Sequence, residues 1–165
     1  MVRRFIGIAA AVCLGAVITG VVADAGAATS IPRCTHRDLA GAIIDEQGAL
    51  GSRFGRLILT NKSSRSCRTK GFIGGQLIAA NGTPLTTHIT RNHATPARTV
   101  VIRSGAAGAL TVHWSVVPSG NHPCPTARWF RVTPPDGTNT IRVFFGDTVC
   151  RGNIDVGPVT DPRTV

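Results

Sequence analysis

The sequence predicts an all-β protein, an immunoglobulin-like antiparallel β-sandwich held by two disulfides. Three observations lead to this fold class. From Leu39 onward apolar residues alternate with polar ones or form short blocks, which Gly, Pro, Asn and Ser interrupt about every ten residues. No segment has a convincing helical period. Four cysteines follow the N-terminal segment, enough for two disulfides in an exported protein.

Residues 1–28 have the order of a secretory signal peptide, which we expect to form a helix preceding the domain. Arg3 and Arg4 precede an apolar run of 19 residues, 5–23, and small residues follow it. This pattern predicts cleavage after Ala27 or Ala28. The run is about long enough to span a bilayer, so retention as an uncleaved anchor is the alternative. Either outcome makes the protein secreted or attached to the cell envelope.

The remaining chain has the size of one domain. Removing residues 1–28 from the 165-residue chain leaves 137 residues, enough to bury a single core. We expect 29–160 to form one β-sandwich domain. The tail 161–165 carries a proline and is expected to fray.

Nine segments carry the strand pattern. They are 39–45, 53–61, 71–80, 85–90, 97–103, 109–117, 127–133, 140–146 and 153–159. Asn81-Gly82 predicts a type I′ hairpin turn, because both central positions of that turn need positive φ. A second reversal is predicted at 134–137, which reads Pro-Pro-Asp-Gly.

Alternation along a strand also predicts which side chains are buried, since successive residues face opposite sides of a sheet. In 109–117 it places Leu110, Val112 and Trp114 on a buried face and leaves His113 on the surface.

The cysteines of the predicted domain are Cys34, Cys67, Cys124 and Cys150. Four cysteines allow three pairings, and the order of the predicted strands favours one of them. Cys34 precedes the first predicted strand and Cys67 follows the second, so a hairpin of these strands would bring both to its open end. Cys124 and Cys150 stand in the same relation to the seventh and eighth strands. We therefore predict the disulfides Cys34–Cys67 and Cys124–Cys150. A four-thiolate zinc site would need short C-x-x-C spacings, which are absent.

The predicted domain is strongly basic. Without Arg3 and Arg4 it keeps 16 of the 18 basic residues, against seven acidic ones, a net charge of about +9. If Cys34 bonds Cys67, six cations gather at one end of the sandwich, where loops commonly carry function. They are Arg33, Arg37, Lys62, Arg65, Arg68 and Lys70. Guanidinium groups bind phosphate and carboxylate in a bidentate manner, so we expect an anion-binding end. A solvated, solubilising surface is the alternative.

Nucleic acid is not the expected partner. The chain has no tyrosine, and its few aromatic residues lie in apolar strand patterns rather than between basic residues, as a stacking platform would require. The predicted export signal also argues against a nucleic-acid partner. The candidate partners are an anionic envelope polymer, a lipid head group or another extracellular protein bound by strand addition.

No catalytic constellation is visible, so we expect a protein that is not an enzyme and needs no cofactor. There is no G-x-S-x-G elbow for a nucleophilic serine. Asp45 and Glu46 are adjacent, so on a strand they are expected to diverge rather than flank one bond. The alternative function is a small extracellular metal-dependent enzyme that uses surface histidines. The histidines are His36, His88, His93, His113 and His122.

Five pieces of the chain together resemble a known family. They read CTHRDL (34–39), LILTNKSSRSC with RTKGF (57–72), SGAAGALTVHW (104–114), CPTARWFRVTPPD (124–136) and CRGNIDVGPV (150–159). The sequence resembles a secreted actinobacterial family catalogued as a domain of unknown function, number four-two-three-two. The resemblance covers nearly all of the predicted domain. It implies a secreted or envelope-attached β-sandwich with paired cysteines, and it implies no catalytic residue.

The residues and the resemblance together favour a non-enzymatic, secreted or envelope-located binding module with a basic, anion-binding loop end.

Overall fold

The computed structural model describes residues 30–121 and 124–164. The predicted signal segment 1–28 lies outside the described residues, so its helix and its cleavage stay predictions. Among the described residues, no helix has the length and apolar character needed to cross a membrane.

The described residues form ten strands and two short 3-10 helices. The strands are β1 (Leu39–Ala49), β2 (Ser52–Asn61), β3 (Cys67–Thr69), β4 (Gly74–Ile78), β5 (His88–Arg91), β6 (Val100–Ile102), β7 (Ala107–Ser115), β8 (Thr126–Thr133), β9 (Ile141–Thr148) and β10 (Asn153–Val156). The helices are η1 (Cys150–Gly152) and η2 (Pro162–Thr164).

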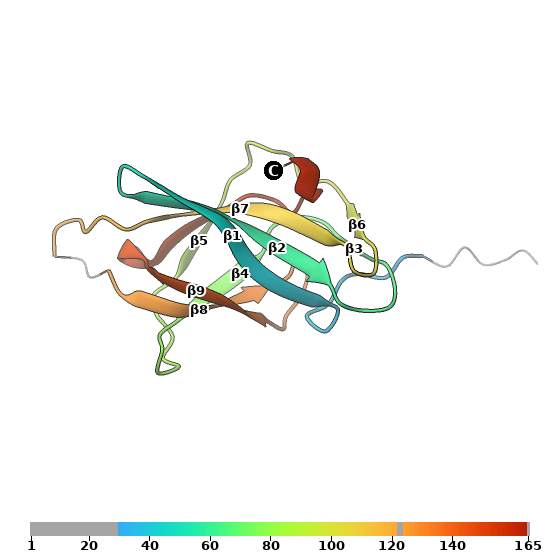
Figure 1. Ribbon diagram of the computed structural model, residues 1–165, viewed down its shortest axis with the longest axis horizontal. Coiled ribbons are helices and arrows are strands. Elements are labelled where there is room, and N and C mark those ends of the chain that lie inside the picture. The colour runs from blue at the N-terminus through green and yellow to red at the C-terminus, as the bar shows by residue number, and fades with distance from the viewer. Residues whose placement is uncertain (1–29, 122–123, 165) are drawn as a thin grey trace, which may run out of the picture.

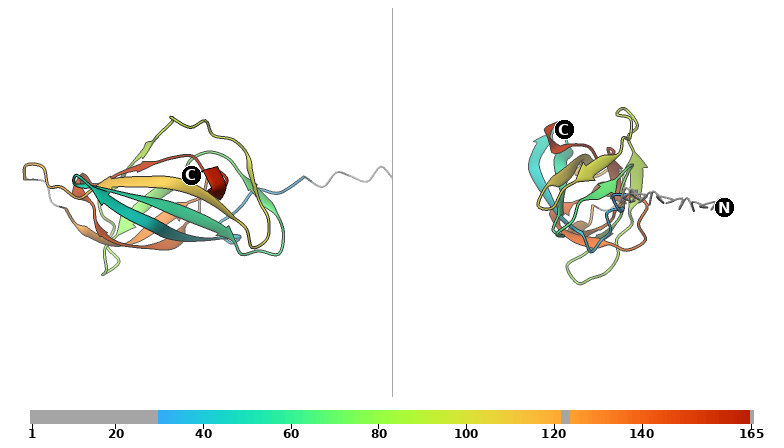
Figure 2. Two further views of the ribbon diagram at one scale, coloured as in Figure 1. Left: turned by 45° about the horizontal axis from the view of Figure 1, so that its top comes forward. Right: turned by 90° about the vertical axis from the view of Figure 1, so that its right-hand side faces the viewer.

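Two sheets lie one over the other along the length of the molecule (Figure 1; Figure 2). The larger sheet has the order β1-β2-β7-β10-β5 and the smaller one β4-β8-β9, while β3 and β6 form a separate ribbon. Neighbouring strands run antiparallel except β10 and β5, which are parallel. The prediction of an all-β sandwich with mainly antiparallel strands is confirmed.

Aromatic rings from both sheets meet in the core. The ring of Trp114 on β7 lies 4.9 Å from that of Phe145 on β9, and Phe130 on β8 lies 6.1 Å from Phe145. All three side chains are buried. The indole Nε1 of Trp114 donates a hydrogen bond of 3.0 Å to Oδ2 of Asp147, so its polar atom is satisfied. His113 points to the opposite side of β7 and is half-exposed, which confirms the predicted faces of this strand.

The first strand lies close to the smaller sheet at β9. A Cβ atom on Gly41 would lie only 2.7 Å from Cγ2 of Val143. Glycine at this position therefore permits the close approach of the two strands.

Each of the nine predicted segments overlaps a strand, although most strand ends differ by a few residues. The ribbon strand β3 was not predicted, because its three residues follow a polar turn and carry no alternating pattern of their own. Strand β1 continues to Ala49, beyond the predicted end at residue 45. It does so through a bulge between Ile44 and Gln47, after which pairing with β2 resumes.

The type I′ turn predicted at Asn81-Gly82 is wrong, although the chain does reverse there. Gly82 has φ 87°, whereas Asn81 is not in the left-handed region. The amide of Gly82 donates to the carbonyl of Ala79, and the amide of Ala79 donates to the carbonyl of Thr83. This is a type I turn followed by a left-handed glycine. The flanking strands β4 and β5 then belong to different sheets.

A hairpin turn with two left-handed residues occurs instead at Leu50-Gly51. Their φ values are 47° and 81°, and the flanking residues Ala49 and Ser52 are paired. Leucine seldom adopts this conformation because its Cβ crowds the backbone. Its side chain is fully exposed, so no packing offsets the strain.

The reversal predicted at 134–137 is present. The amide of Gly137 donates to the carbonyl of Pro134 at 3.0 Å, and Asp136 has φ 58°. This turn joins β8 to β9.

Both disulfides join the predicted partners. Cys34 bonds Cys67, and Cys124 bonds Cys150. Each pair lies at the open end of a hairpin, the first formed by β1 and β2 and the second by β8 and β9. The disulfide pairing predicted from strand order is therefore confirmed.

A buried asparagine organises the turn that follows β2. Asn61 is fully buried, and its Nδ2 donates to the carbonyls of Arg65 at 2.8 Å and Ile102 at 2.9 Å. Its Oδ1 accepts from the amide and the hydroxyl of Ser63 at 3.0 and 2.7 Å. One side chain thus satisfies the polar groups of its own turn and of β6.

We expect Asn61→Ala to lower the free energy of unfolding by about 2–4 kcal/mol, because it leaves buried donors and acceptors unsatisfied. Urea denaturation followed by tryptophan fluorescence measures the change. The matched control is Asn81→Ala. Asn81 is exposed and accepts one bond, from the amide of Thr83, so its loss should stay below about 1 kcal/mol. Equal losses would contradict the assigned role of Asn61.

We expect Leu50→Asn to stabilise the protein by about 0.5–1 kcal/mol, since asparagine tolerates the left-handed conformation better than leucine. The melting temperature in differential scanning calorimetry reports this gain. Ile31→Asn is the control, because Ile31 is also exposed but does not have positive φ. A gain of the same size in the control would show that removal of an exposed apolar side chain, not relief of strain, is responsible.

Candidate functional site at the basic end

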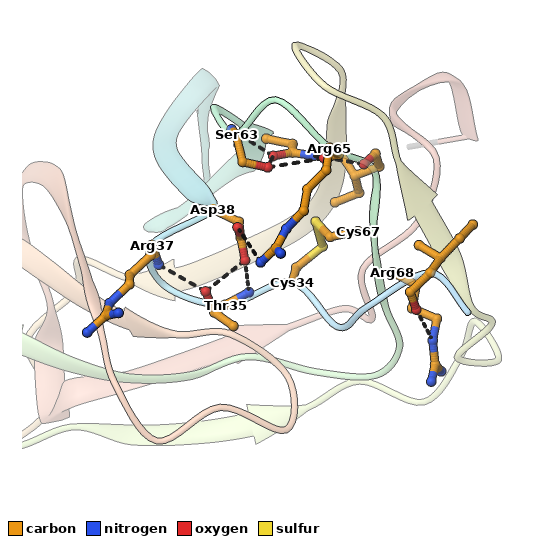
Figure 3. Close-up of a disulfide and its surroundings, with 11 residues drawn as sticks. Cys34, Thr35, Arg37, Asp38, Ser63, Arg65, Cys67 and Arg68 are labelled. Carbon is orange, nitrogen blue, oxygen red and sulfur yellow. Dashed lines mark hydrogen bonds and ion pairs between the residues drawn. A yellow bond between two sulfur atoms is a disulfide. The ribbon is translucent and has the colours of Figure 1, made fainter. Parts of the chain in front are cut away.

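Three segments that are distant in the sequence meet at one end of the sandwich. They are 31–38 before β1, 62–70 after β2, and 134–139 between β8 and β9. The disulfide Cys34–Cys67 joins the first two (Figure 3). The amide of Cys34 also donates to the carbonyl of Arg68, and the amide of Arg68 to the carbonyl of Pro32. The cysteines and the backbone thus fix the segments that carry the candidate cations.

A buried carboxylate lies at the centre of this end. Oδ2 of Asp38 accepts hydrogen bonds from the amide of Thr35 at 2.8 Å and from its hydroxyl at 2.7 Å (Figure 3). Arg65 approaches Oδ1 of Asp38 to 3.7 Å. The hydrogen bond from the Thr35 hydroxyl, together with its amide and the charge of Arg65, lowers the pKa of Asp38 despite its burial.

Two of the six predicted cations are paired with acids. Arg65 pairs with Asp38, and Arg33 pairs with Asp136 at 3.3 Å. The Arg33–Asp136 pair is largely exposed and therefore contributes little to stability. Asp136 belongs to the β8–β9 turn, so this ion pair joins the turn to the segment before β1.

Five of the six cations border two separate concavities. Arg33, Arg37 and Arg65 line a cleft of about 550 Å³, whose opposite wall is formed by 135–139. We call it the basic cleft. Arg33 also lines a smaller hollow of about 110 Å³ together with Arg68 and Lys70.

The side chains of Arg37 and Arg68 point away from each other on opposite sides of the disulfide (Figure 3). The Nε of Arg68 donates to the carbonyl of Ile31 at 2.8 Å. Lys62 is exposed but is not among the residues that line either concavity. The structure therefore brings three of the predicted cations around one cleft rather than gathering all six.

The histidines proposed for a metal are separated from one another. His113 on β7 lies 2.9 Å from Asp155 through Nδ1 and stacks on Phe54, while His93 contacts Phe72. His88 is exposed on β5, beside Asn153 rather than His113. Within 30–121 and 124–164 no three metal-ligating side chains are grouped. His36 lines the basic cleft, and His122 lies outside the described residues.

The sequence interpretation missed a groove on the outer face of the larger sheet. It has a volume of about 740 Å³. Asp45 and Glu46 both line it, along with Phe54, His113 and Asp155. Both residues thus border one groove, although strand alternation predicts that their side chains diverge. The bulge in β1 places Asp45 at φ 55°, which interrupts the strand alternation on which that expectation depended.

Comparison with known proteins identifies one family. The family model described as Domain of unknown function (DUF4232) matches residues 34–160, from the first disulfide-bonded cysteine to the residue that pairs with β7 near the C-terminus. No curated protein and no solved structure matches the chain.

We expect Asp38→Asn to destabilise the protein by about 2 kcal/mol at pH 7. Because the pKa of Asp38 is lowered on folding, its stabilising effect is present above the unfolded pKa of about 3.9 and is lost as the pH falls toward the folded value. The difference in unfolding free energy between the two proteins should therefore narrow below about pH 4.

Urea denaturation at several pH values tests this dependence. Asp136→Asn serves as the control, since Asp136 is exposed and its loss should cost less than about 1 kcal/mol. A loss for Asp38→Asn that stays constant between pH 7 and pH 3 would contradict the role of the ionised carboxylate.

Proposed function

Because the chain belongs to the DUF4232 family, whose function is unknown, we propose from its site that it is a non-enzymatic module that binds anionic ligands at its basic cleft. The ligand class is a phosphate or carboxylate presented by an envelope glycopolymer or a lipid head group.

The arrangement of Arg33, Arg37 and Arg65 around the basic cleft is the observation that carries this proposal. Arg33 and Arg65 are held by single acids, so each keeps N–H donors that can turn to a ligand. Arg37 has no ion pair within the described residues and is exposed. A ligand anion would provide this guanidinium with the bidentate partner that the protein does not supply.

We place this binding activity outside the cytosol. Two disulfides support such a location, because the cytosol keeps most cysteines reduced. The order of residues in 1–28, basic then apolar then small, supports export as well.

The competing hypothesis of a metal-dependent enzyme receives less support from the geometry. The imidazole of His113 is engaged by Asp155 and Phe54, and the ring of His93 by Phe72. A metal would have to recruit ligands from side chains that lie in separate places. A melting temperature that rises on addition of Zn²⁺ or Cu²⁺ would favour this alternative.

We expect Arg37→Glu to weaken binding to phosphatidylglycerol vesicles or to soluble polyphosphate about tenfold, equivalent to about 1.4 kcal/mol. Co-sedimentation measures the first ligand and titration calorimetry the second, so the two arms distinguish a lipid from a polymer source. Binding should fall steeply as salt is raised from 0.05 to about 0.5 M, because the contacts are electrostatic.

The matched control is Lys62→Glu, which makes the same change of charge at the same end but outside the basic cleft. Because the Lys62 side chain is exposed and does not line the cleft, this variant should change affinity less than about threefold at about 0.1 M salt, which screens exposed charges. Equal effects of the two variants would replace a defined site with a general attraction to a basic surface.

A further inference from the structure

Arginine and aromatic side chains share the outer face of the smaller sheet. In register, Trp129 on β8 lies opposite Phe144 on β9, and Arg131 lies opposite Arg142. The core side of the same strands carries buried residues such as Phe130 and Val143, so the arginines and these two rings face outward. Phe144 is 56% exposed. We call Arg128, Trp129, Arg131, Arg142 and Phe144 the arginine–aromatic face.

The arginines of this face are stacked on its rings. The Cζ of Arg142 lies 4.5 Å from the ring centroid of Trp129. The Cζ of Arg128 lies 5.7 Å from Trp129 and 5.6 Å from Phe144. The two rings meet edge to face at 5.8 Å. Cation–π stacking orders the guanidinium planes while it leaves their N–H groups free to donate to a ligand.

This geometry corrects one premise of the sequence interpretation. The aromatic residues were expected to lie within apolar strand patterns, yet Trp129 and Phe144 lie between arginines. Regular alternation already turns Trp129 and Phe144 outward, and a register shift between β8 and β9 at Ala127 adds Arg128 to the same face. Ala127 and Phe130 are both buried although three residues apart, so the two residues between them, Arg128 and Trp129, remain on the outside.

The face has positive charge that the protein does not neutralise. Within residues 30–121 and 124–164, Arg128, Arg131 and Arg142 make no ion pair. The carboxylate of β9, Asp147, is engaged by Arg53 at 3.5 Å and by the Trp114 indole. The arginines of the basic cleft differ in this respect, since Arg33 and Arg65 have acidic partners.

We infer that the arginine–aromatic face binds a linear acidic polysaccharide, with uronate carboxylates on the arginines and the apolar face of a sugar ring against Phe144. The inference rests on the proposed function only in taking the protein to bind anions, because the surface is a different one. Neighbouring strands lie about 4.8 Å apart and residues along a strand about 3.3 Å apart. Arg128 and Arg142 lie against one ring and Arg131 lies opposite Arg142, so three guanidinium groups share one face, which suits a polyanion better than a single small anion.

A polysaccharide fits this face better than a nucleic acid. Proteins that bind single strands without sequence preference stack successive bases on open aromatic rings. Here Arg142 and Arg128 already lie over the Trp129 ring, and Arg128 also lies against Phe144, which keeps 56% of its surface exposed, so neither ring is an uncovered platform for a base. The two disulfides also indicate an oxidising compartment outside the cytosol, which favours a glycopolymer over a nucleic acid as the ligand.

The test uses titration of the disulfide-bonded protein with polygalacturonate and with its methyl-esterified form, which keeps the sugar ring but removes the charge. We expect Arg142→Gln and Phe144→Thr each to weaken polygalacturonate binding at least fivefold. Arg103→Gln removes an exposed arginine from another part of the surface and should change binding less than twofold. The esterified polymer should bind at least tenfold more weakly than the acid.

The outcomes separate this inference from the proposed function. Loss of polygalacturonate binding in Arg142→Gln and Phe144→Thr, with binding to phosphatidylglycerol vesicles retained, supports a second site. Arg37→Glu should show the reverse pattern. Equal losses in Arg142→Gln and Arg103→Gln would overturn the inference, as would undiminished binding of the esterified polymer. Tighter binding of oligo-dT than of polygalacturonate would overturn it in favour of a nucleic-acid surface. Unchanged melting temperatures of the variants show that each remains folded.

Discussion

The buried amide of Asn61 joins parts of the chain that would otherwise have unsatisfied polar groups in the interior. Its Nδ2 donates hydrogen bonds to the carbonyls of Arg65 and Ile102, and its Oδ1 accepts one from the amide of Ser63. The turn after β2 therefore has one geometry, and that geometry delivers Cys67 to Cys34. The segment before β1, which carries Arg33 and Arg37, is held in place through this disulfide. The basic cleft thus depends on a neutral side chain that no ligand would touch.

Two acidic residues, Asp38 and Asp136, fix the positions of arginine side chains at the basic end. Asp38 is buried and held by Thr35, and it attracts Arg65 to one wall of the cleft. Asp136 attracts Arg33 to the β8–β9 turn on the other wall. Each acid neutralises part of the positive charge but also fixes the direction of a long, flexible side chain. Arrangement of donors, more than net charge, therefore distinguishes this cleft from an ordinary basic surface.

Irregular strand pairing shapes the two other surface features, the groove on the larger sheet and the arginine–aromatic face. The bulge in β1 interrupts the strand alternation at Asp45 and Glu46, which line the groove together with His113. The register shift between β8 and β9 keeps Arg128 and Trp129 together on the outside. In each case one interruption of the strand alternation changes which side chains are exposed. Such interruptions recur next to functional sites in β-proteins, and here they occur at two grouped sets of polar or charged side chains.

The amino-acid pattern by itself determined the all-β class, the position of nine strands, the burial of Trp114 and the pairing of the four cysteines. These features follow from the alternation of apolar and polar residues and from the positions of the cysteines relative to hairpins, so the order of residues is enough to predict them. The basic end was also predictable, because Cys34 and Cys67 bring neighbouring cations together. Only the tertiary structure decided that Lys62 lies outside the cleft, that Arg37 and Arg68 point apart, and that Trp129 and Phe144 stack with arginines. Those outcomes depend on register shifts and on contacts between distant strands, which residue order does not specify.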